Sequence, residues 1–319
     1  MQEHRRRASA KLAAQIGVTA VAACLTLAAC GGRQSSTPNV PTVHFPVSIT
    51  APGGATVTIA KQPHRVVSLS PTATEMLFAI GAGSQVIAVD DQSNYPASAP
   101  KTKLSGFQPN IEAIAAYSPD LVVAAEDTGG LVHGVQALNV PMLVEPAAKN
   151  LNDSYLQIRQ LGAATGHPAE ADSLVGKMRS EVGSFVASLS KTSRQVRVYH
   201  ELDNTYYSAT SNTFIGQVYK LFGLTNIADS ATSATSDYPQ LSAEYIVASN
   251  PDLIVLADTK CCQQDLSSVA ARPGWSVITA VKTGQVIGAD DDIASRWGPR
   301  IIDFMRAVAQ HVQQVEKAA

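Results

Sequence analysis

Two stretches of this 319-residue chain decide its fold: IEAIAAYSPDLVVAAEDT at residues 111–128 and AEYIVASNPDLIVLADT at residues 243–259. Residues of the first stretch recur in the second, 132 positions later, namely Glu112 as Glu244, Pro119 as Pro251 and Asp120 as Asp252. In both stretches an apolar run follows Pro-Asp directly, which is typical of a parallel strand buried on both faces. The repetition predicts two similar halves.

Each half alternates strands with helices. In the first half we expect strands at residues 65–70, 121–125 and 141–144 and helices at 72–80 and 131–138. In the second half we expect strands at 196–199, 253–257 and 286–288 and helices at 213–222 and 242–248. A β-hairpin over residues 46–60 precedes both. The alternation predicts an α/β protein with two Rossmann-like lobes and right-handed crossovers.

The expected helix ends follow from capping residues. Thr72 is predicted to cap the first helix, with Glu75 three residues later completing a capping box. Gly81 and Gly223 are predicted to end matching helices in the two halves.

The most periodic segment lies between the halves. Its apolar residues follow one helical stripe: Leu174, Met178, Val182, Phe185 and Leu189. Pro168 suits the first turn of this helix, and Gly166 closes the helix before it. We therefore expect a single long α-helix to join the lobes. The predicted boundaries are an N-terminal lobe at 46–150, connecting helices at 151–192 and a C-terminal lobe at 193–319.

The N-terminus is typical of an export signal. Arginines at positions 5–7 precede an apolar stretch, residues 12–29, that carries no charge. The sequence LAACGG at 27–32 resembles a bacterial lipobox, which implies that Cys30 is diacylated and becomes the first mature residue. Residues 1–29 are then the signal peptide and 30–45 a tether. The alternative is a membrane-spanning anchor, for which a run of about 18 residues is barely long enough.

The net charge bears on the class of partner, and the cysteines bear on the redox chemistry of the mature chain. With 24 basic and 26 acidic residues the formal net charge is −2, so no excess of positive charge suggests nucleic acid as a partner. Cys24 falls in the signal peptide, which leaves adjacent Cys261 and Cys262 as the thiols of the mature chain in an oxidising compartment. Three states stay open for the pair: a vicinal disulfide, two free thiols, or pairing between molecules. We also hypothesise that a disulfide would contact a ligand.

Several short motifs resemble one known family. They are RVVSLSPTATE at 65–75, NYP at 94–96, GF at 106–107 and DIASRWGPR at 292–300. Together with the two lobes and the lipobox, they resemble the helical-backbone, class III periplasmic substrate-binding proteins of ABC importers, the group that binds cobalamin, ferric siderophores or haem. The resemblance implies a ligand cleft between the lobes, delivery to an ABC permease dimer with its ATPase, no catalysis and no cofactor of its own. We expect a monomer, lipid-anchored on the outer face of the membrane.

Residue roles follow from the resemblance. Glu112 and Glu244 match the glutamates, one per lobe, that dock onto permease arginines. Further positions match the cleft lining of the family: Phe107, Tyr238, Asp292 and Arg296. Tyr206 and Tyr207, just after the first strand of the second half, are similar candidates. Aromatic rings suit flat chelates, and an arginine fork suits a carboxylate or an anionic ligand. One of the two adjacent tyrosines is expected to face the core instead.

The chain departs from the cobalamin-binding members of this group at two positions. Those members carry a tryptophan where this chain has Ala125, and a tyrosine near the position of Gln92. Two stacking surfaces are therefore missing. Ferric siderophores and haem consequently stay open as ligands beside cobalamin.

Two other classes of function compete with this interpretation. For an exported enzyme, the chain contains only incomplete catalytic motifs. GWSVI at 274–278 lacks the second glycine of a nucleophile elbow, and His200-Glu201 lacks the second histidine of a zincin. A lipoprotein that binds bare zinc or manganese ions shares the architecture but needs about three histidines with a carboxylate in the cleft. His133 and His200 are the histidines expected nearest the cleft, too few for such a site.

Overall fold

The structure, a computed structural model, describes residues 44–52, 54–189, 195–231 and 236–317. These residues belong to one compact unit, Val40–Ala319. The predicted signal peptide, Cys30, nearly all of the tether and Gly53 of the hairpin lie outside the described residues. None of the described helices has the length and apolar character needed to cross a membrane.

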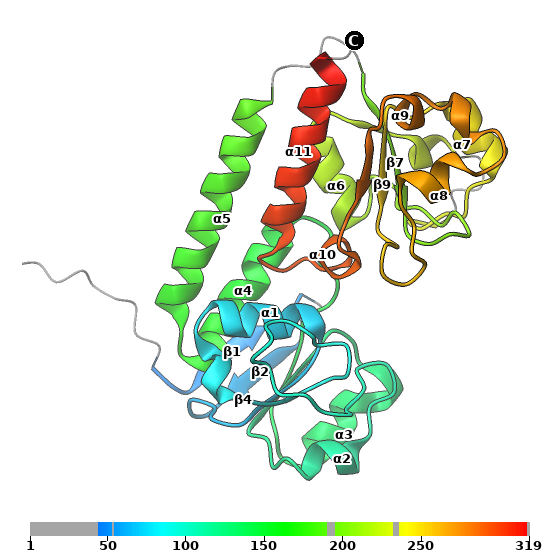
Figure 1. The fold of residues 1–319 in the computed structure, drawn as a ribbon. Coiled ribbons are helices and arrows are strands. Elements are labelled where there is room, and N and C mark those ends of the chain that lie inside the picture. The colour runs from blue at the N-terminus through cyan, green and yellow to red at the C-terminus, as the bar shows by residue number, and fades with distance from the viewer. Residues whose placement is uncertain (1–43, 53, 190–194, 232–235, 318–319) are drawn as a thin grey trace, which may run out of the picture. The chain divides into compact units, whose positions relative to one another are not determined.

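The N-terminal lobe contains the predicted hairpin and a parallel four-stranded sheet (Figure 1). The hairpin strands are β1 (Val47–Thr50) and β2 (Thr56–Ile59). The sheet has the order β4-β3-β5-β6, with β3 (Val66–Leu69), β4 (Val86–Val89), β5 (Leu121–Ala124) and β6 (Met142–Val144). Its helices are α1 (Pro71–Ala79), α2 (Ile111–Ala115) and α3 (Leu131–Ala137). All residues of β3 and β5 are buried, as expected for central strands covered on both faces.

The C-terminal lobe has a second parallel four-stranded sheet, in the order β10-β9-β7-β8. Its strands are β7 (Arg197–Glu201), β8 (Thr225–Asn226), β9 (Leu253–Leu256) and β10 (Val286–Gly288). Its helices are α6 (Phe214–Leu221), α7 (Ala243–Ser249), α8 (Leu266–Ala270), α9 (Thr279–Lys282) and α10 (Asp291–Ser295). Short 3-10 turns complete the two lobes: Ala82–Gln85, Thr128–Gly130, Ile227–Ser230 and Trp275–Val277.

The internal repeat is present in three dimensions. The Asp120 carboxylate accepts a hydrogen bond from the backbone N–H of Arg65 at 2.8 Å. In the other lobe the Asp252 carboxylate accepts from the backbone N–H of Arg197 at 2.9 Å. Each aspartate thus ties the start of one central strand to the start of its neighbour. The Pro-Asp motif is a structural anchor repeated in both sheets.

Long helices connect the lobes. α4 (Leu151–Thr165) ends at Gly166, whose φ of 83° is left-handed, and α5 (Pro168–Ser188) begins at a proline, as predicted. α5 lies beside the C-terminal helix α11 (Ile301–Lys317) in Figure 1. The residues of the predicted stripe are buried or pack against the core. The stripe therefore predicted the correct face.

The cap predicted for α1 is wrong. The helix begins at Pro71, and the Ser70 hydroxyl caps it by accepting from the N–H of Ala73. Proline lacks an N–H and has a helical φ, so it favours the first helical position and moves the cap from the predicted Thr72 to Ser70, two residues earlier. Glu75 takes no part in a capping box, and its side chain is buried, only 3% exposed. The Glu75 carboxylate instead accepts hydrogen bonds at the boundary between the lobes.

Candidate functional site

A pocket of about 420 Å³ lies where α10 of the C-terminal lobe meets the N-terminal lobe. Residues that follow β3, β4 and β5 line one side, and residues of α10 with the turn after it line the other. The carboxyl ends of parallel strands are where open α/β sheets bind ligands. The pocket is therefore the candidate binding site.

Three of the six residues predicted for the cleft line this pocket: Phe107, Asp292 and Arg296. Phe107 is 75% exposed, the largest fraction of any exposed large apolar residue in the described part of the chain. Tyr238 lines a neighbouring pocket of about 460 Å³. The two pockets share Ala147, so they adjoin along the boundary between the lobes.

The adjacent tyrosines line neither pocket. Tyr206 stacks on Trp275 in the C-terminal lobe, with ring centroids 5.6 Å apart, and the Arg272 guanidinium lies 5.3 Å from its ring. Tyr207 is exposed. One tyrosine of the pair thus packs inward and the other faces solvent, and a ligand contact for either stays a prediction.

Both positions at which the chain departs from the cobalamin-binding pattern line the pocket. Ala125 follows β5 and Gln92 follows β4. Neither side chain supplies an aromatic face. The pocket therefore presents Phe107 and Trp297 as its aromatic residues among those the structure describes.

Arg296 is committed to protein partners. Its guanidinium donates to Glu75 Oε1 at 2.8 Å, Asn94 Oδ1 at 2.9 Å, the Gln92 carbonyl at 3.0 Å and Asp292 Oδ1 at 2.7 Å. Only 9% of the side chain is exposed. A guanidinium has five N–H donors, so four acceptors leave little for a ligand. Three of the acceptors belong to the N-terminal lobe, and Arg296 therefore joins the lobes.

Glu75 is the centre of this junction. Besides Arg296, it accepts from the Nε of Arg300 at 2.9 Å. The Arg300 guanidinium lies 4.2 Å from the ring of Tyr95. The motifs at 65–75, 94–96 and 292–300 therefore meet in space. These motifs were visible in the sequence and marked the site, but nothing in the sequence indicated that they bind one another.

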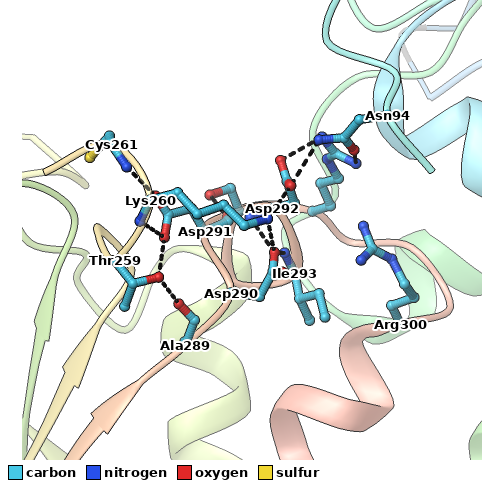
Figure 2. A network of polar contacts seen from close by, with 12 residues as sticks. Asn94, Thr259, Lys260, Cys261, Ala289, Asp290, Asp291, Asp292, Ile293 and Arg300 are labelled. Atoms are coloured by element: carbon cyan, nitrogen blue, oxygen red, sulfur yellow. Dashed lines mark hydrogen bonds and ion pairs between the residues drawn. The ribbon is translucent and has the colours of Figure 1, made fainter. Parts of the chain in front are cut away.

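Three consecutive aspartates open α10 and form a network with Lys260 (Figure 2). The Lys260 ammonium donates to Asp290 at 2.8 Å and to Asp292 at 2.6 Å. Asn94 reaches across from the N-terminal lobe and donates to Asp292 at 2.9 Å. Burial alone would raise the pKa of Asp292, but these bonds and the nearby cations lower it. Asp292 is accordingly ionised at neutral pH.

Comparison with known proteins assigns the family. Residues 66–293 match the family described as periplasmic binding protein, a match that spans most of the chain and both sheets. The chain belongs to the periplasmic binding protein family.

Individual relatives agree with this assignment. The chain is 30% identical over 314 residues to an uncharacterized ABC transporter substrate-binding lipoprotein, YvrC, of Bacillus subtilis, covering 95% of this chain and 98% of the relative. It is 30% identical over 273 residues to a cobalamin-binding protein of Halobacterium salinarum, covering 83% and 73% of the two chains. The solved structure of the haem-binding protein RhuT of Roseiflexus superposes with a TM-score of 0.70, at 22% identity over 80% of this chain and 99% of that one. The fold and the relatives are those of substrate-binding proteins and not of enzymes.

The two glutamates predicted to dock this periplasmic binding protein onto its permease occupy equivalent places. Glu112 lies in the first turn of α2 and Glu244 in the first turn of α7. Both are exposed, and each helix is capped by the side chain of the preceding residue, Asn110 or Ser242. Neither glutamate lines the pocket. Docking stays a prediction for both.

The adjacent cysteines of this periplasmic binding protein are joined in a disulfide, Cys261–Cys262. The N–H groups of Lys260 and Cys261 both donate to Asp291, at 3.0 Å each. Figure 2 shows Cys261 beside the start of α10. The pair lies close to the pocket but is not part of its lining. Its contact with a ligand stays a hypothesis.

The histidine predicted nearest the cleft in this lobe is in the core. His200, in β7, is fully buried, and its Nδ1 lies 2.6 Å from the hydroxyl of Tyr219. Burial lowers its pKa to about 4. The described part of the chain contains no cluster of three or more histidine, cysteine or acidic side chains arranged to hold a metal ion. His200 lines neither the first pocket nor the adjoining one.

A buried glutamate follows β6, at the carboxyl-end edge of the N-terminal sheet where the pocket also lies. Glu145 is 2% exposed, and neither carboxyl oxygen has a hydrogen-bond partner among the described residues. Burial raises its pKa to about 8. The folded protein therefore holds Glu145 protonated at neutral pH, whereas the unfolded chain ionises it.

We expect Glu145→Gln to change the pH dependence of stability. Because the folded pKa lies above the unfolded one, ionisation in the unfolded chain destabilises the wild type as pH rises from about 4.5 to about 8. Relative to the variant, the wild type should lose about 1.4 kcal/mol of unfolding free energy per pH unit in that window. Urea midpoints across the window measure this. Parallel pH profiles for the two proteins would show that Glu145 is ionised in the fold.

Proposed function

We propose that this protein is the solute-binding component of an ABC importer and captures a corrinoid or an iron chelate, either a siderophore complex or haem. The single observation that carries the proposal is the pocket lined from both lobes, with Phe107 exposed on one side and α10 on the other. The Halobacterium relative, named as a cobalamin-binding protein, supports a ligand of this class.

The two adjoining pockets suit a bulky ligand better than a small one. Phe107 lines the first pocket and Tyr238 the second, and both rings are at least half exposed. A rigid macrocycle or chelate can lie against such faces at low entropic cost. We propose that the ligand rests along the boundary and spans both pockets. Trp297 lines the first pocket, so its fluorescence should report binding.

Phe107→Ala should weaken ligand binding by about tenfold, because the exposed ring is the largest apolar contact that the N-terminal lobe offers. Its exposure means that the change should leave the unfolding midpoint unaltered. The measurement is a fluorescence titration of the purified protein with cyanocobalamin, a neutral ferric trihydroxamate and haem.

The matched control is Leu156→Ala, which removes an exposed apolar side chain of α4 outside both pockets. The control should bind like the wild type. Unchanged affinity in Phe107→Ala would exclude this pocket as the site. Absence of binding to every ligand in the panel would contradict the proposed function itself.

We propose that Cys30 carries the lipid anchor and that residues 31–45 tether the lobes to the outer face of the membrane. The lipobox-like LAACGG supports this, as does the Bacillus relative, which is named a lipoprotein. Two acyl chains suffice for stable anchoring. A monomer so placed meets its permease by diffusion in the plane of the membrane.

We propose that Glu112 and Glu244 engage the permease dimer. The repeat places them at equivalent positions, one per lobe, exposed and outside the pocket. Two like charges related by internal repetition fit a partner built from two similar subunits. Arginine side chains are the complementary groups on such a partner.

A further inference from the structure

The charge of the pocket is strongly one-sided. Among the described lining residues Arg296 alone is basic, whereas four are acidic: Asp90, Glu126, Asp291 and Asp292. Arg296 is already paired with Glu75 and Asp292 and donates to two further acceptors. Its positive charge is therefore balanced within the protein.

The acidic residues of the pocket differ in their exposure and in their hydrogen-bond and ion-pair partners. Asp291 accepts hydrogen bonds from two backbone N–H groups and from the Thr259 hydroxyl at 2.8 Å. Glu126 is exposed and has no ion-pair partner among the described residues. Asp90 is buried, which raises its pKa, and its carboxylate accepts a hydrogen bond from the Ser93 hydroxyl. Glu126 and Asp291 are thus carboxylates of the pocket without a balancing cation.

The nearest cations do not reverse this balance. The Lys260 ammonium is held between Asp290 and Asp292, and the Arg300 guanidinium is bound to Glu75. Each of these two cations is therefore matched by at least one carboxylate. The adjoining pocket adds one cation, Lys149, and one acidic residue, Asp237, so carboxylates outnumber cations along the two pockets and the field that a ligand meets is negative.

We propose that this pocket selects chelates that carry no free carboxylate, so that it takes neutral or cationic ligands with N–H donors and rejects anionic ones. The inference rests on the proposed function and narrows its ligand class. Ionised carboxylates accept hydrogen bonds only, so amide-bearing ligands satisfy them while ligand carboxylates repel them. Arg296 then positions α10 against the N-terminal lobe instead of receiving a ligand carboxylate.

The test compares ligands that differ by an amide or ester against a carboxylate on one scaffold. The pairs are cyanocobalamin with its isomeric monocarboxylic acids, and haem dimethyl ester with haem. Calorimetric titration of the full chain should show the uncharged member of a pair binding about tenfold more tightly at low salt. The ratio should shrink at about 0.5 M salt, where such repulsion is screened.

Glu126→Gln identifies the source of the preference. This change should reduce the ratio to about threefold by strengthening the carboxylate ligand and leaving the neutral one unchanged. The control Glu170→Gln removes an exposed carboxylate in the first turn of α5, outside the pocket, and should leave the ratio as in the wild type. A purely structural role of Glu126 would shift both ligands together.

The outcomes separate the two proposals. Equal or tighter binding of the carboxylate member overturns the charge selection and leaves the proposed function standing. An unchanged ratio in Glu126→Gln overturns the assignment of the preference to this residue. Failure of every member of both pairs to bind overturns the inference, and it overturns the proposed function as well if the neutral ferric trihydroxamate also fails to bind.

Discussion

Glu75→Gln should lower the free energy of unfolding by about 3–5 kcal/mol, the usual cost of removing one partner from a buried ion pair. Glu75 is 3% exposed and accepts from the guanidinium groups of Arg296 and Arg300. Those two side chains are themselves only 9% and 17% exposed. Glutamine keeps the shape of the side chain but leaves Arg300 without its carboxylate and Arg296 with Asp292 as its remaining one. Equilibrium urea unfolding measures the loss.

The control is Glu181→Gln on α5. Glu181 pairs with Arg306 of α11 at 3.3 Å, with both side chains nearly half exposed. An exposed pair of this kind is worth about 1 kcal/mol or less. Adding Arg300→Gln to Glu75→Gln should recover part of the loss, because it removes one uncompensated cation. A midpoint shift in Glu75→Gln no larger than that of the control would contradict the account of the lobe junction.

Charge reversal at both docking glutamates, Glu112→Arg with Glu244→Arg, should reduce ligand uptake by cells at least about thirtyfold, because each disrupted charge pair costs several kcal/mol at an interface. The affinity of the purified protein for its ligand should not change, since neither residue lines the pocket. The measurement is uptake of labelled ligand in cells that carry the variant as their sole copy. Each single variant should show an intermediate loss.

Glu170→Arg serves as the control, because it reverses an exposed charge in the first turn of a helix outside both predicted docking positions. It should transport like the wild type. If the double variant at Glu112 and Glu244 transports normally, docking takes place elsewhere on the protein. If it loses affinity for the ligand, those glutamates act on the pocket and not on the permease.

The fold followed from local patterns. Apolar runs after Pro-Asp predicted the central strands because a buried parallel strand needs no polar face, and the stripe from Leu174 to Leu189 predicted the long helix. The cap of α1 was missed because Pro71 moved the start of the helix by one residue. Local rules therefore predicted the helix, but they did not predict that Glu75, which takes no part in a capping box, is buried at the boundary between the lobes.

The site was less predictable, because it depends on contacts between distant residues. Arg296 and Glu75 are 221 positions apart, and nothing in either motif indicates that the two bind each other instead of a ligand. The adjacent tyrosines present the same difficulty: Tyr206 has a φ of 71° and packs on Trp275, which only the fold can show. Resemblance found Phe107 because the chain retains the motif around it.

The central claim is that one chelate binds between the lobes, against Phe107 and the start of α10. A crystal structure of the protein grown with its tightest-binding neutral chelate tests this most directly. We expect one chelate in the pocket, in contact with Phe107 and within hydrogen-bonding reach of the aspartates that open α10. A chelate bound on any other surface, or an empty pocket in protein saturated with that ligand, would contradict the claim.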